Sequence, residues 1–120
     1  MKIYIASALK NAEKVRSVRN RLIDLGHTIT YDWTTHSRVE DVNLLKDIAI
    51  KEMGGVIEAE LLVVLWPAGF GTHCEFGMAA ATGKPIYMHL PDDPDIELKS
   101  FYFLESVSKF TDLEKLIAAI

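Results

Sequence analysis

Hydrophobic and polar positions along the chain follow two alternating patterns. Short runs of apolar and β-branched residues predict strands at 2–6, 27–31, 61–66 and 84–90, with a weaker strand within 101–110. Apolar residues at helical spacing predict helices between these strands, over about 15–25, 39–54, 72–82 and 111–120. The first helix has Leu25 as its last inward position and ends at Gly26, Gly83 ends the third, and Thr111 is the expected N-cap of the fourth.

This alternation predicts an α/β fold, a flavodoxin-like or Rossmann-like doubly wound parallel sheet of four to five strands within three α/β/α layers. Residues 61–66 are apolar throughout, as expected of a central strand that is covered on both faces. Right-handed crossovers favour the strand order 2-1-3-4-5, in which a crevice opens between the loops that follow strands 1 and 3. Residues 1–120 are expected to form a single domain, since no linker, repeat or low-complexity tract interrupts them.

Composition narrows the class of protein. The chain has 120 residues, of which 49% are hydrophobic, and a formal net charge of −4. Its basic residues concentrate in one predicted helix, so a nucleic acid polymer is not an expected partner. The single cysteine excludes an intramolecular disulfide and favours the cytoplasm, and no apolar run has the length of a signal sequence or a membrane span. We therefore expect a soluble cytoplasmic protein without membrane contact.

The segment 61–85 carries the most distinctive chemistry. It joins the buried strand to a helix of small residues through a loop with Gly69 and Gly71. Such a loop lets a ligand approach the backbone closely, and the unpaired N–H groups at the start of a helix attract phosphate and other anions. Glu75, on the predicted first turn of this helix, is a candidate nucleophile beside that cradle. Thr72 and Glu75 also match the S/T-x-x-E capping box, in which Glu75 only caps the Thr72 N–H, and both interpretations stay open.

A second carboxylate lies at an unusual position. On a helical wheel, Glu52 falls in the middle of an apolar stripe formed by Leu45, Ile48, Ala49 and Val56. A buried carboxylate needs a partner, a proton or a cavity, because an unpaired charge is costly to bury. If Glu52 points into the crevice, two carboxylates share one pocket, and one can stay ionised while the other holds a proton. Alternatively, the helix frays at Gly54 and Gly55 and lets Glu52 turn to solvent.

These features together resemble the nucleoside 2-deoxyribosyltransferase family, which includes 2'-deoxynucleoside 5'-monophosphate N-glycosidases. The resemblance covers nearly the whole chain. It rests on the initial MKIYIAS, on the eight-residue spacing from Glu52 to Glu60, and on the helix pattern E-x-G-x-A-x-x-x-G-K formed by Glu75, Gly77, Ala79, Gly83 and Lys84. The chain departs from the family in having Glu52 and Glu60 where Asp is usual, in having Ala8 where the monophosphate hydrolases have serine, and in lacking a recognisable C-terminal asparagine.

The resemblance implies a role for individual residues. Glu75 corresponds to the nucleophile that attacks the anomeric carbon and forms a glycosyl-enzyme ester, and Tyr4 corresponds to the tyrosine that positions it. Ser7, Ala8 and Lys10 fall on the loop that holds phosphate in the monophosphate hydrolases. Together with the crevice loops, the expected substrate-binding residues are Ser7, Ala8, Lys10, Trp33, Pro67, Gly69, Gly71 and Thr72. Trp33 either stacks on a nucleobase or covers the edge of the core. The resemblance also implies a homodimer.

We therefore expect an enzyme, a transferase or an N-glycosidase, that cleaves or exchanges the N-glycosidic bond of (deoxy)nucleosides or their 5'-monophosphates through a covalent glycosyl-Glu75 intermediate. Glu52 is the expected donor of the proton that the leaving base needs. Two alternatives stay open, a nucleotide-binding module without turnover and a cytokinin-type phosphoribohydrolase, whose P-G-G-x-G-T-x-x-E motif resembles residues 67–75. A phospho-receiver domain is excluded, because Trp66 and Pro67 stand where strand 3 would end in an acidic phosphoacceptor.

The remaining candidate residues have simpler interpretations. Four histidines show no metal-ligand spacing with one another or with Cys74, so no metal or other cofactor is expected. We interpret each of these four histidines as a surface or core residue. They are His27, His36, His73 and His89. Cys74 has no partnering base in the sequence and is expected to be a small buried residue.

Overall fold

Five parallel strands form the sheet in the order β2-β1-β3-β4-β5, which confirms the predicted topology. The computed structural model describes residues 1–120. β1 pairs with β3 from Ile3 and Leu61 to Ala6 and Val64, so the two strands end at the same edge of the sheet. The strands are β1 (Lys2–Ala6), β2 (Thr28–Ile29), β3 (Leu61–Leu65), β4 (Ile86–His89) and β5 (Val107–Phe110).

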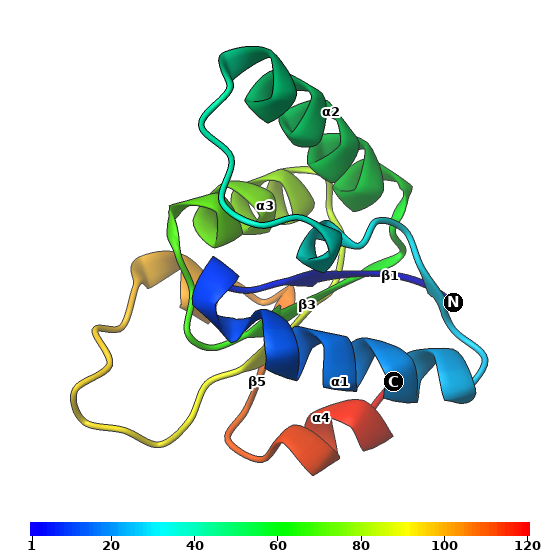
Figure 1. The fold of residues 1–120 in the computed structure, drawn as a ribbon. Coiled ribbons are helices and arrows are strands. Elements are labelled where there is room, and N and C mark those ends of the chain that lie inside the picture. Colours follow the sequence, from blue (N-terminus) through cyan, green and yellow to red (C-terminus); the bar gives the residue numbers. More distant parts are fainter.

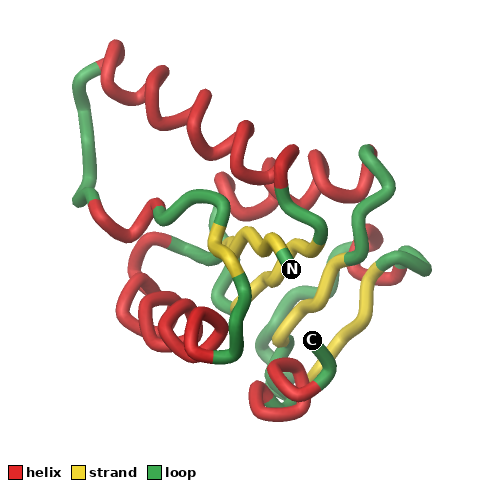
Figure 2. Tube along the Cα trace, turned by 90° about the vertical axis from the view of Figure 1, so that its right-hand side faces the viewer, coloured by secondary structure: helices red, strands yellow, loops and turns green.

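Helices cover both faces of the sheet (Figure 1). α1 (Ala12–Asp24) and α4 (Leu113–Ala118) lie on one face, and α2 (Val42–Glu58) and α3 (Phe70–Ala81) pack together on the other. The 3₁₀ turns are η1 (Leu9–Asn11), η2 (Trp33–Thr35) and η3 (Ser100–Phe103). Figure 2 shows that the N-terminal half of α2 extends beyond the sheet and α3. None of the helices combines the length and the apolar character that crossing a bilayer requires.

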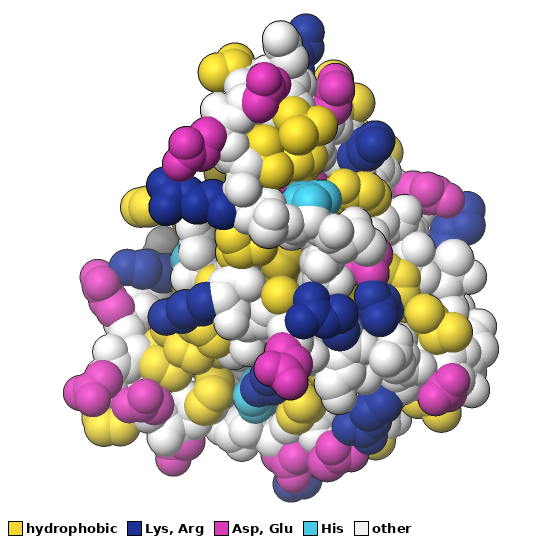
Figure 3. Space-filling model, in the orientation of Figure 1, with side chains coloured by type: hydrophobic (Ala, Val, Ile, Leu, Met, Phe, Trp, Pro, Cys, Tyr) yellow, Lys and Arg dark blue, Asp and Glu magenta, His cyan; other side chains and the backbone are white.

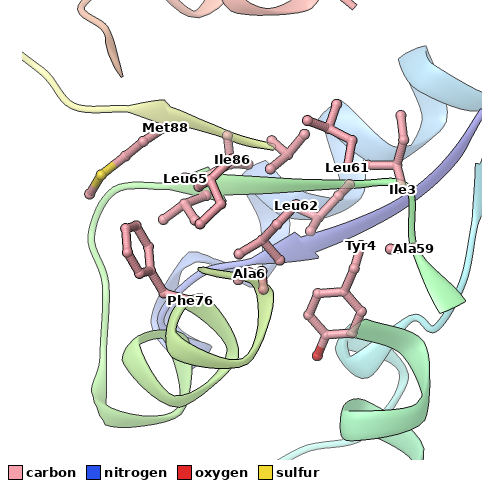
Figure 4. Close-up of a cluster of buried hydrophobic side chains, with 14 of the residues drawn as sticks. Ile3, Tyr4, Ala6, Ala59, Leu61, Leu62, Leu65, Phe76, Ile86 and Met88 are labelled. Atoms are coloured by element: carbon pink, nitrogen blue, oxygen red, sulfur yellow. The ribbon is translucent and has the colours of Figure 1, made fainter. Parts of the chain in front are cut away.

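The core lies on both sides of the central strands. All residues of β3 are buried, because helices cover both faces of the sheet there. Tyr4 projects from β1 toward the side on which α2 and α3 lie, and Phe76 projects from α3 back to the sheet (Figure 4). Burying such side chains stabilises the fold by about 25 cal/mol per Å² of apolar surface. The same packing fixes the face of α3 that carries Glu75.

The second helix differs most from its predicted bounds. It covers 42–58 instead of 39–54, because the Asp41 side chain accepts a hydrogen bond from the Leu44 N–H at 2.9 Å and starts the helix there. At the other end, Lys84 Nζ donates to the carbonyl oxygens of Ile57 at 2.8 Å and Ala59 at 2.6 Å. These bonds satisfy carbonyls that a helix C-terminus leaves unpaired. Gly54 and Gly55 therefore lie inside the helix, and the alternative in which the helix frays there is wrong.

Three smaller predictions also need correction. β2 is shorter than predicted and ends at Ile29; the Thr30 N–H still donates to the Ile3 carbonyl at 3.0 Å, while the Thr30 hydroxyl donates to the Gly55 carbonyl at 2.7 Å. Leu25 is 61% exposed, not inward, because α1 ends at Asp24 and Gly26 turns the chain with φ of 94°. α4 is capped by Asp112, whose side chain accepts from the Glu114 N–H at 2.9 Å, and not by Thr111.

Replacing Gly55 by alanine should lower the free energy of unfolding. An added Cβ would lie 2.8 Å from Tyr31 Cβ and 3.0 Å from Tyr4 Cδ2, so one of these elements must shift. Overpacking of this kind costs about 1–3 kcal/mol, which outweighs the higher helix propensity of alanine. The matched control is Gly54→Ala, where the added Cβ meets nothing within 4 Å and the higher propensity should stabilise the protein. Urea denaturation measures both, and equal shifts in the two variants would contradict the steric explanation.

Candidate active site

A cavity of about 200 Å³ opens between the loops that follow β1 and β3, at the crevice that the strand order predicts. Its lining brings together most of the predicted site residues, namely Ser7, Ala8, Trp33, Glu52, Gly69, Gly71, Thr72 and Glu75, and adds Leu9 and Phe70. A larger hollow of about 460 Å³ lies beyond β4 and β5, and neither Glu52 nor Glu75 lines it. The smaller cavity is therefore the candidate active site.

Glu75 lines this cavity and forms a buried pair with Tyr4, which lies behind Glu75 and is not part of the lining. The Tyr4 hydroxyl donates a hydrogen bond to the Glu75 carboxylate, and the two residues are 0% and 6% exposed, respectively. Burial raises the pKa of Glu75 to about 8, the hydrogen bond from Tyr4 opposes this, and the negative charge of Glu52 adds to it. Burial and the Glu75 charge raise the pKa of Tyr4, which therefore keeps its proton and acts as a donor.

Glu75 lies too far along α3 to cap the N-terminus of the helix. α3 begins at Phe70 with Gly69 as N-cap, and Thr72 Oγ1 accepts a hydrogen bond from the Gly69 N–H at 2.9 Å. The alternative interpretation of Thr72 and Glu75 as a capping box is therefore wrong, and Glu75 lies on the second turn of α3 instead of the predicted first turn. Its carboxylate bonds to Tyr4 instead of the helix terminus. Glycine at the N-cap offers no side-chain oxygen, so the first amides of the helix lack the usual capping partner.

Glu52 reaches the same cavity from α2. It is partly buried, and burial raises its pKa while the nearby charge of His36 opposes the shift. The predicted inward stripe is only partly correct, because Val56 is buried whereas Leu45 is 45% exposed where α2 leaves the sheet. A second cavity of about 230 Å³ adjoins the first and shares Leu9, Trp33 and Glu52 with it. Two carboxylates with raised pKa values thus face one cavity, an arrangement that can hold a single proton between them.

The loop after β1 uses its polar groups to hold the loop after β3. The Ser7 hydroxyl donates to the Leu65 carbonyl at 2.7 Å, and the Ala8 N–H donates to the Pro67 carbonyl at 2.8 Å. Asn11, which sequence reasoning missed, donates from Nδ2 to Ser7 Oγ at 2.9 Å. Ser7 and Ala8 line the cavity, but these donors are already engaged. Their predicted part in binding phosphate therefore stays a prediction.

Two predicted binding residues lie outside the cavity lining. Pro67 contributes its carbonyl to the loop contact and does not face the cavity. Lys10 lines a separate shallow depression on α1 together with Asn11, Glu13, Lys14 and Ser17. Lys10 points elsewhere because it belongs to η1, which turns the chain away from the crevice into α1.

Trp33 combines the two interpretations that the sequence left open. It is 6% exposed, its Nε1–H donates to the Ile5 carbonyl at 2.8 Å, and its ring borders both cavities. Asp32 fixes the turn that carries it, since the carboxylate accepts from the Thr34 N–H at 3.0 Å and pairs with Arg19. Burial raises the pKa of Asp32, but the hydrogen bonds from Thr34 and the contact with Arg19 outweigh burial and leave the pKa lowered. Trp33 is thus a core residue with one part available to a ligand.

His36 and Tyr31 were not predicted to take part in the site. Tyr31 Oη and His36 Nε2 lie 3.2 Å apart, and His36 lines the second cavity with Glu52. Burial raises the pKa of Tyr31, and the charge of Glu52 adds to the shift. The only signal in the sequence was their position near Trp33, after the second predicted strand.

Cys74 is exposed, contrary to the prediction, because α3 turns Thr72, Glu75, Phe76 and Ala79 inward instead. No group of three or more His, Cys, Asp or Glu side chains is placed to hold a metal ion.

The raised pKa of Glu75 predicts that stability falls with increasing pH. The folded protein holds a proton on Glu75 up to about pH 8, whereas an ordinary glutamate with a pKa of 4.5 releases it earlier. The stabilisation is therefore complete below about pH 4.5 and is lost as the pH rises through about 8. Glu75→Gln cannot ionise, so its free energy of unfolding should rise relative to the parent by several kcal/mol over this range, at about 1.4 kcal/mol per pKa unit. Urea denaturation from about pH 5 to about pH 9 measures the difference, and a difference that stays constant with pH would contradict a raised pKa.

Comparison with known proteins establishes the fold. No protein-family model matches the sequence, and no curated protein matches it. Among solved structures, the CMP N-glycosidase BcmB of Clostridium botulinum matches with a TM-score of 0.71 and 15% identity, over 99% of this chain and 97% of that chain. A 2-deoxyribosyltransferase of the psychrotolerant bacterium Bacillus psychrosaccharolyticus matches with a TM-score of 0.73 and 20% identity, over 98% and 90% of the two chains.

A conserved protein of Enterococcus faecalis V583 also matches, with a TM-score of 0.58 and 21% identity, over 99% of this chain and 87% of that chain. The two matched enzymes belong to the nucleoside 2-deoxyribosyltransferase family. The chain therefore has the fold of that family, which confirms the resemblance found in the sequence at the level of fold.

Proposed function

We propose that the protein cleaves or exchanges the N-glycosidic bond of nucleosides or nucleoside 5'-monophosphates, with Glu75 as the nucleophile. The observation that carries the proposal is the buried Tyr4–Glu75 pair, in which Glu75 lines a cavity that the second carboxylate, Glu52, also lines. The fold supports it, because the matched proteins include a CMP N-glycosidase and a 2-deoxyribosyltransferase. The exposed free thiol of Cys74 suits the cytoplasm, where we place the protein.

The proposed reaction has two steps. The Glu75 carboxylate attacks the anomeric carbon of the sugar, the bond to the base nitrogen breaks, and its electron pair leaves with the base. Glu52 gives a proton to that base, and a glycosyl ester on Glu75 remains. Water or a second base then attacks the same carbon, Glu52 takes up the proton that this nucleophile loses, and Glu75 is released as a carboxylate. Water gives hydrolysis, and a base gives exchange.

In the free protein burial favours the shared proton on Glu75, whose pKa is raised to about 8, so the proposed roles require this proton to pass to Glu52. When Glu52 holds the proton, its charge no longer raises the pKa of Glu75, and Glu75 ionises more readily. The reactive form of the pair is the one in which Glu52 is protonated and Glu75 is ionised. Tyr4 keeps its proton and can hold the attacking carboxylate in a fixed orientation through both steps. Activity should therefore depend on a single shared proton.

A panel of substrates tests the proposal. The protein is incubated with purine and pyrimidine nucleosides, their 2'-deoxy forms and their 5'-monophosphates, with and without a second free base, and the products are resolved by chromatography. Free base and free sugar indicate hydrolysis, and a new nucleoside indicates transfer. Binding of a nucleotide by calorimetry without any product over a long incubation would overturn the proposal and support a binding module.

We further infer that the protein is a homodimer formed through α2. Ile50, Met53 and Ile57 recur at i, i+3 and i+7 and are 53%, 43% and 57% exposed, a spacing that suits pairing with another helix. Val42 is 77% exposed and lies about three turns before Met53 on the same side of α2, so it extends the stripe. Figure 3 shows apolar side chains gathered at the end of the molecule that α2 forms. Large exposed apolar patches mark interfaces, and a second copy presents an identical stripe.

Introducing a charge into this stripe should shift the protein to monomers. Met53→Lys places a charged group in the centre of the proposed interface, and we expect the dimer dissociation constant to rise about tenfold or more. Sedimentation velocity over a concentration series measures it. The matched control is Ile23→Lys, which introduces the same charge at an apolar position of α1 that is 50% exposed. A parent protein that sediments as a monomer at all concentrations would contradict the inferred dimer.

A further inference from the structure

Gly69 is held at both of its peptide groups by the residues that follow it. Its N–H donates to Thr72 Oγ1 at 2.9 Å, and its carbonyl accepts from the His73 N–H at 3.2 Å and from His73 Nδ1 at 2.7 Å. Glycine has more conformational freedom than any other residue, so each contact that holds it restricts the chain at this point. Its φ of −106° is open to any residue, and an absent side chain keeps the cavity wall open. The contacts with Thr72 and His73 offset the freedom that comes with glycine.

His73 is itself held by a residue from a distant part of the chain. Its Nε2 lies 2.7 Å from the hydroxyl of Tyr102 in η3, and the two rings stack with centroids 5.9 Å apart. His73 is exposed, so packing alone does not fix its ring. Tyr102 is 1% exposed, its ring contacts Phe76, and its carbonyl accepts from Lys109 Nζ at 2.9 Å. Tyr102 is therefore a rigid support, and His73 connects it to Gly69.

The direction of these hydrogen bonds follows from the chemistry of the groups. The Gly69 carbonyl only accepts, so His73 Nδ1 carries the proton. In the neutral ring Nε2 is then the acceptor, and the Tyr102 hydroxyl donates to it. A buried hydroxyl without a partner is costly, and His73 is the partner of the Tyr102 hydroxyl. The order Tyr102 to His73 to Gly69 is thus the only one that satisfies all three groups with a neutral ring.

We propose that His73 and Tyr102 are positioning residues that hold the N-terminus of α3, formed by Gly69, Phe70 and Gly71, in its ligand-binding shape. The His73 N–H and the His73 ring both bond to the Gly69 carbonyl, which therefore points along α3. The Phe70 N–H belongs to the same trans peptide group and points in the opposite direction, away from the helix. Gly69, Phe70 and Gly71 all line the candidate cavity. The Gly69 N–H is engaged by Thr72, so the Phe70 and Gly71 amides are the ones that can donate to an oxygen of the substrate that does not react, either on the sugar or on a 5'-phosphate.

The first test does not depend on activity. Nitrogen-15 NMR of the histidine rings in the intact protein distinguishes the two neutral tautomers. We expect His73 in the Nδ1–H form in the parent, and a mixture of tautomers in Tyr102→Phe, where Nε2 has lost its donor. A parent in which His73 is in the Nε2–H form would overturn the proposal. This result stands even if the proposed glycosidic reaction is absent, because the panel of substrates tests that reaction separately on the parent.

The second test rests on the proposed function and separates positioning from a purely structural role. Amides at the N-terminus of α3 that bind a non-reacting oxygen contribute to KM, so Tyr102→Phe should raise KM about fivefold and leave kcat within about twofold. His73→Phe keeps a ring for stacking but loses both side-chain bonds, and should raise KM further. His73→Asn can still donate to the Gly69 carbonyl and should return KM to the level of Tyr102→Phe. Measurement with a nucleoside and with its 5'-monophosphate shows which oxygen these amides bind, since a larger effect on the monophosphate indicates the phosphate.

The matched control is Tyr87→Phe, which removes a tyrosine hydroxyl from β4 that makes no hydrogen bond within the protein while its ring packs on Phe110. We expect its KM and kcat to equal those of the parent. Thermal unfolding of every variant reports whether the fold is intact. Variants at His73 and Tyr102 that lose stability but keep the parent KM would show a structural role only, and a loss of kcat at unchanged KM would equally overturn the proposal.

Discussion

Replacing Glu75 with glutamine is expected to reduce base release or base exchange by about 10⁴-fold or more, because glutamine cannot form the glycosyl ester. The variant should fold, since glutamine has nearly the same shape and its amide oxygen can still accept the hydrogen bond from Tyr4. Initial rates of base release, measured by chromatography with the best substrate of the panel, give the ratio directly. Acid quenching of the parent during turnover, followed by mass spectrometry of the peptide that contains Glu75, should reveal the covalent sugar.

The matched control for this variant is Glu58→Gln. Glu58 lies on α2 outside the cavity, and its exposed carboxylate forms an ion pair with Lys2 at 3.1 Å. Exposed pairs of this kind contribute little, so parent activity is expected. Parent-like activity in Glu75→Gln would exclude Glu75 as the nucleophile, whatever the control shows.

Replacing Glu52 with glutamine should reduce the rate by about 10²- to 10⁴-fold, the usual contribution of a general acid. The reason is specific to the leaving group, since an unprotonated base departs as an anion. A nucleoside with an N7-methylated purine already carries a positive charge on the base and leaves without a proton. The deficit of Glu52→Gln should therefore be small on that substrate and large on the unmethylated one.

Equal deficits on both substrates would show that Glu52 acts in some way other than by protonating the base. Glu52→Asp serves as the control, because aspartate keeps the acid and shortens its reach by one methylene. A return of activity in this variant would indicate that the position tolerates either acid. A further loss would indicate that the reach of glutamate fits the distance from α2 to the substrate, as orientation effects of about an ångström would predict.

The sheet could be predicted because local patterns specify it directly. Residues 61–65 are apolar at every position, as is typical of a strand that is buried on both faces of a sheet. The order of the strands follows from the alternation of elements and the hand of crossovers. Boundaries were less predictable where the deciding partner is remote in sequence. α2 continues past Gly54 and Gly55, and Lys84 bonds to the carbonyls at its C-terminal end. The sequence of α2 itself does not indicate this contact with Lys84.

The candidate site was likewise predictable in part, and the unpredicted part depends on partners that are remote in sequence. Glu75, Glu52 and the glycines could be predicted to share a crevice, because the strand order brings their loops together. The partner of Glu75 was indicated only by resemblance, since Tyr4 lies 71 positions away and pairing across β1 and α3 leaves no periodic signal. Lys10 shows the opposite error, because a residue next to a loop in sequence turned out to lie on the outer side of η1. The histidines lack ligand spacing in the sequence, and their tyrosine partners could not be predicted from it: His73 contacts Tyr102, and His36 contacts Tyr31.

The contact of Lys84 with the end of α2 has a mechanical consequence. α2 is fixed at its C-terminal end and leaves the body of the protein at the other, so it behaves as a rod clamped at one end. At 1.5 Å per residue, Glu52 lies about 10 Å from the clamp and Val42 about 25 Å from it. A small tilt of the rod displaces Val42 more than twice as far as Glu52. The outer half of the helix can therefore adapt to whatever it binds, while the carboxylate near the clamp keeps its distance to Glu75.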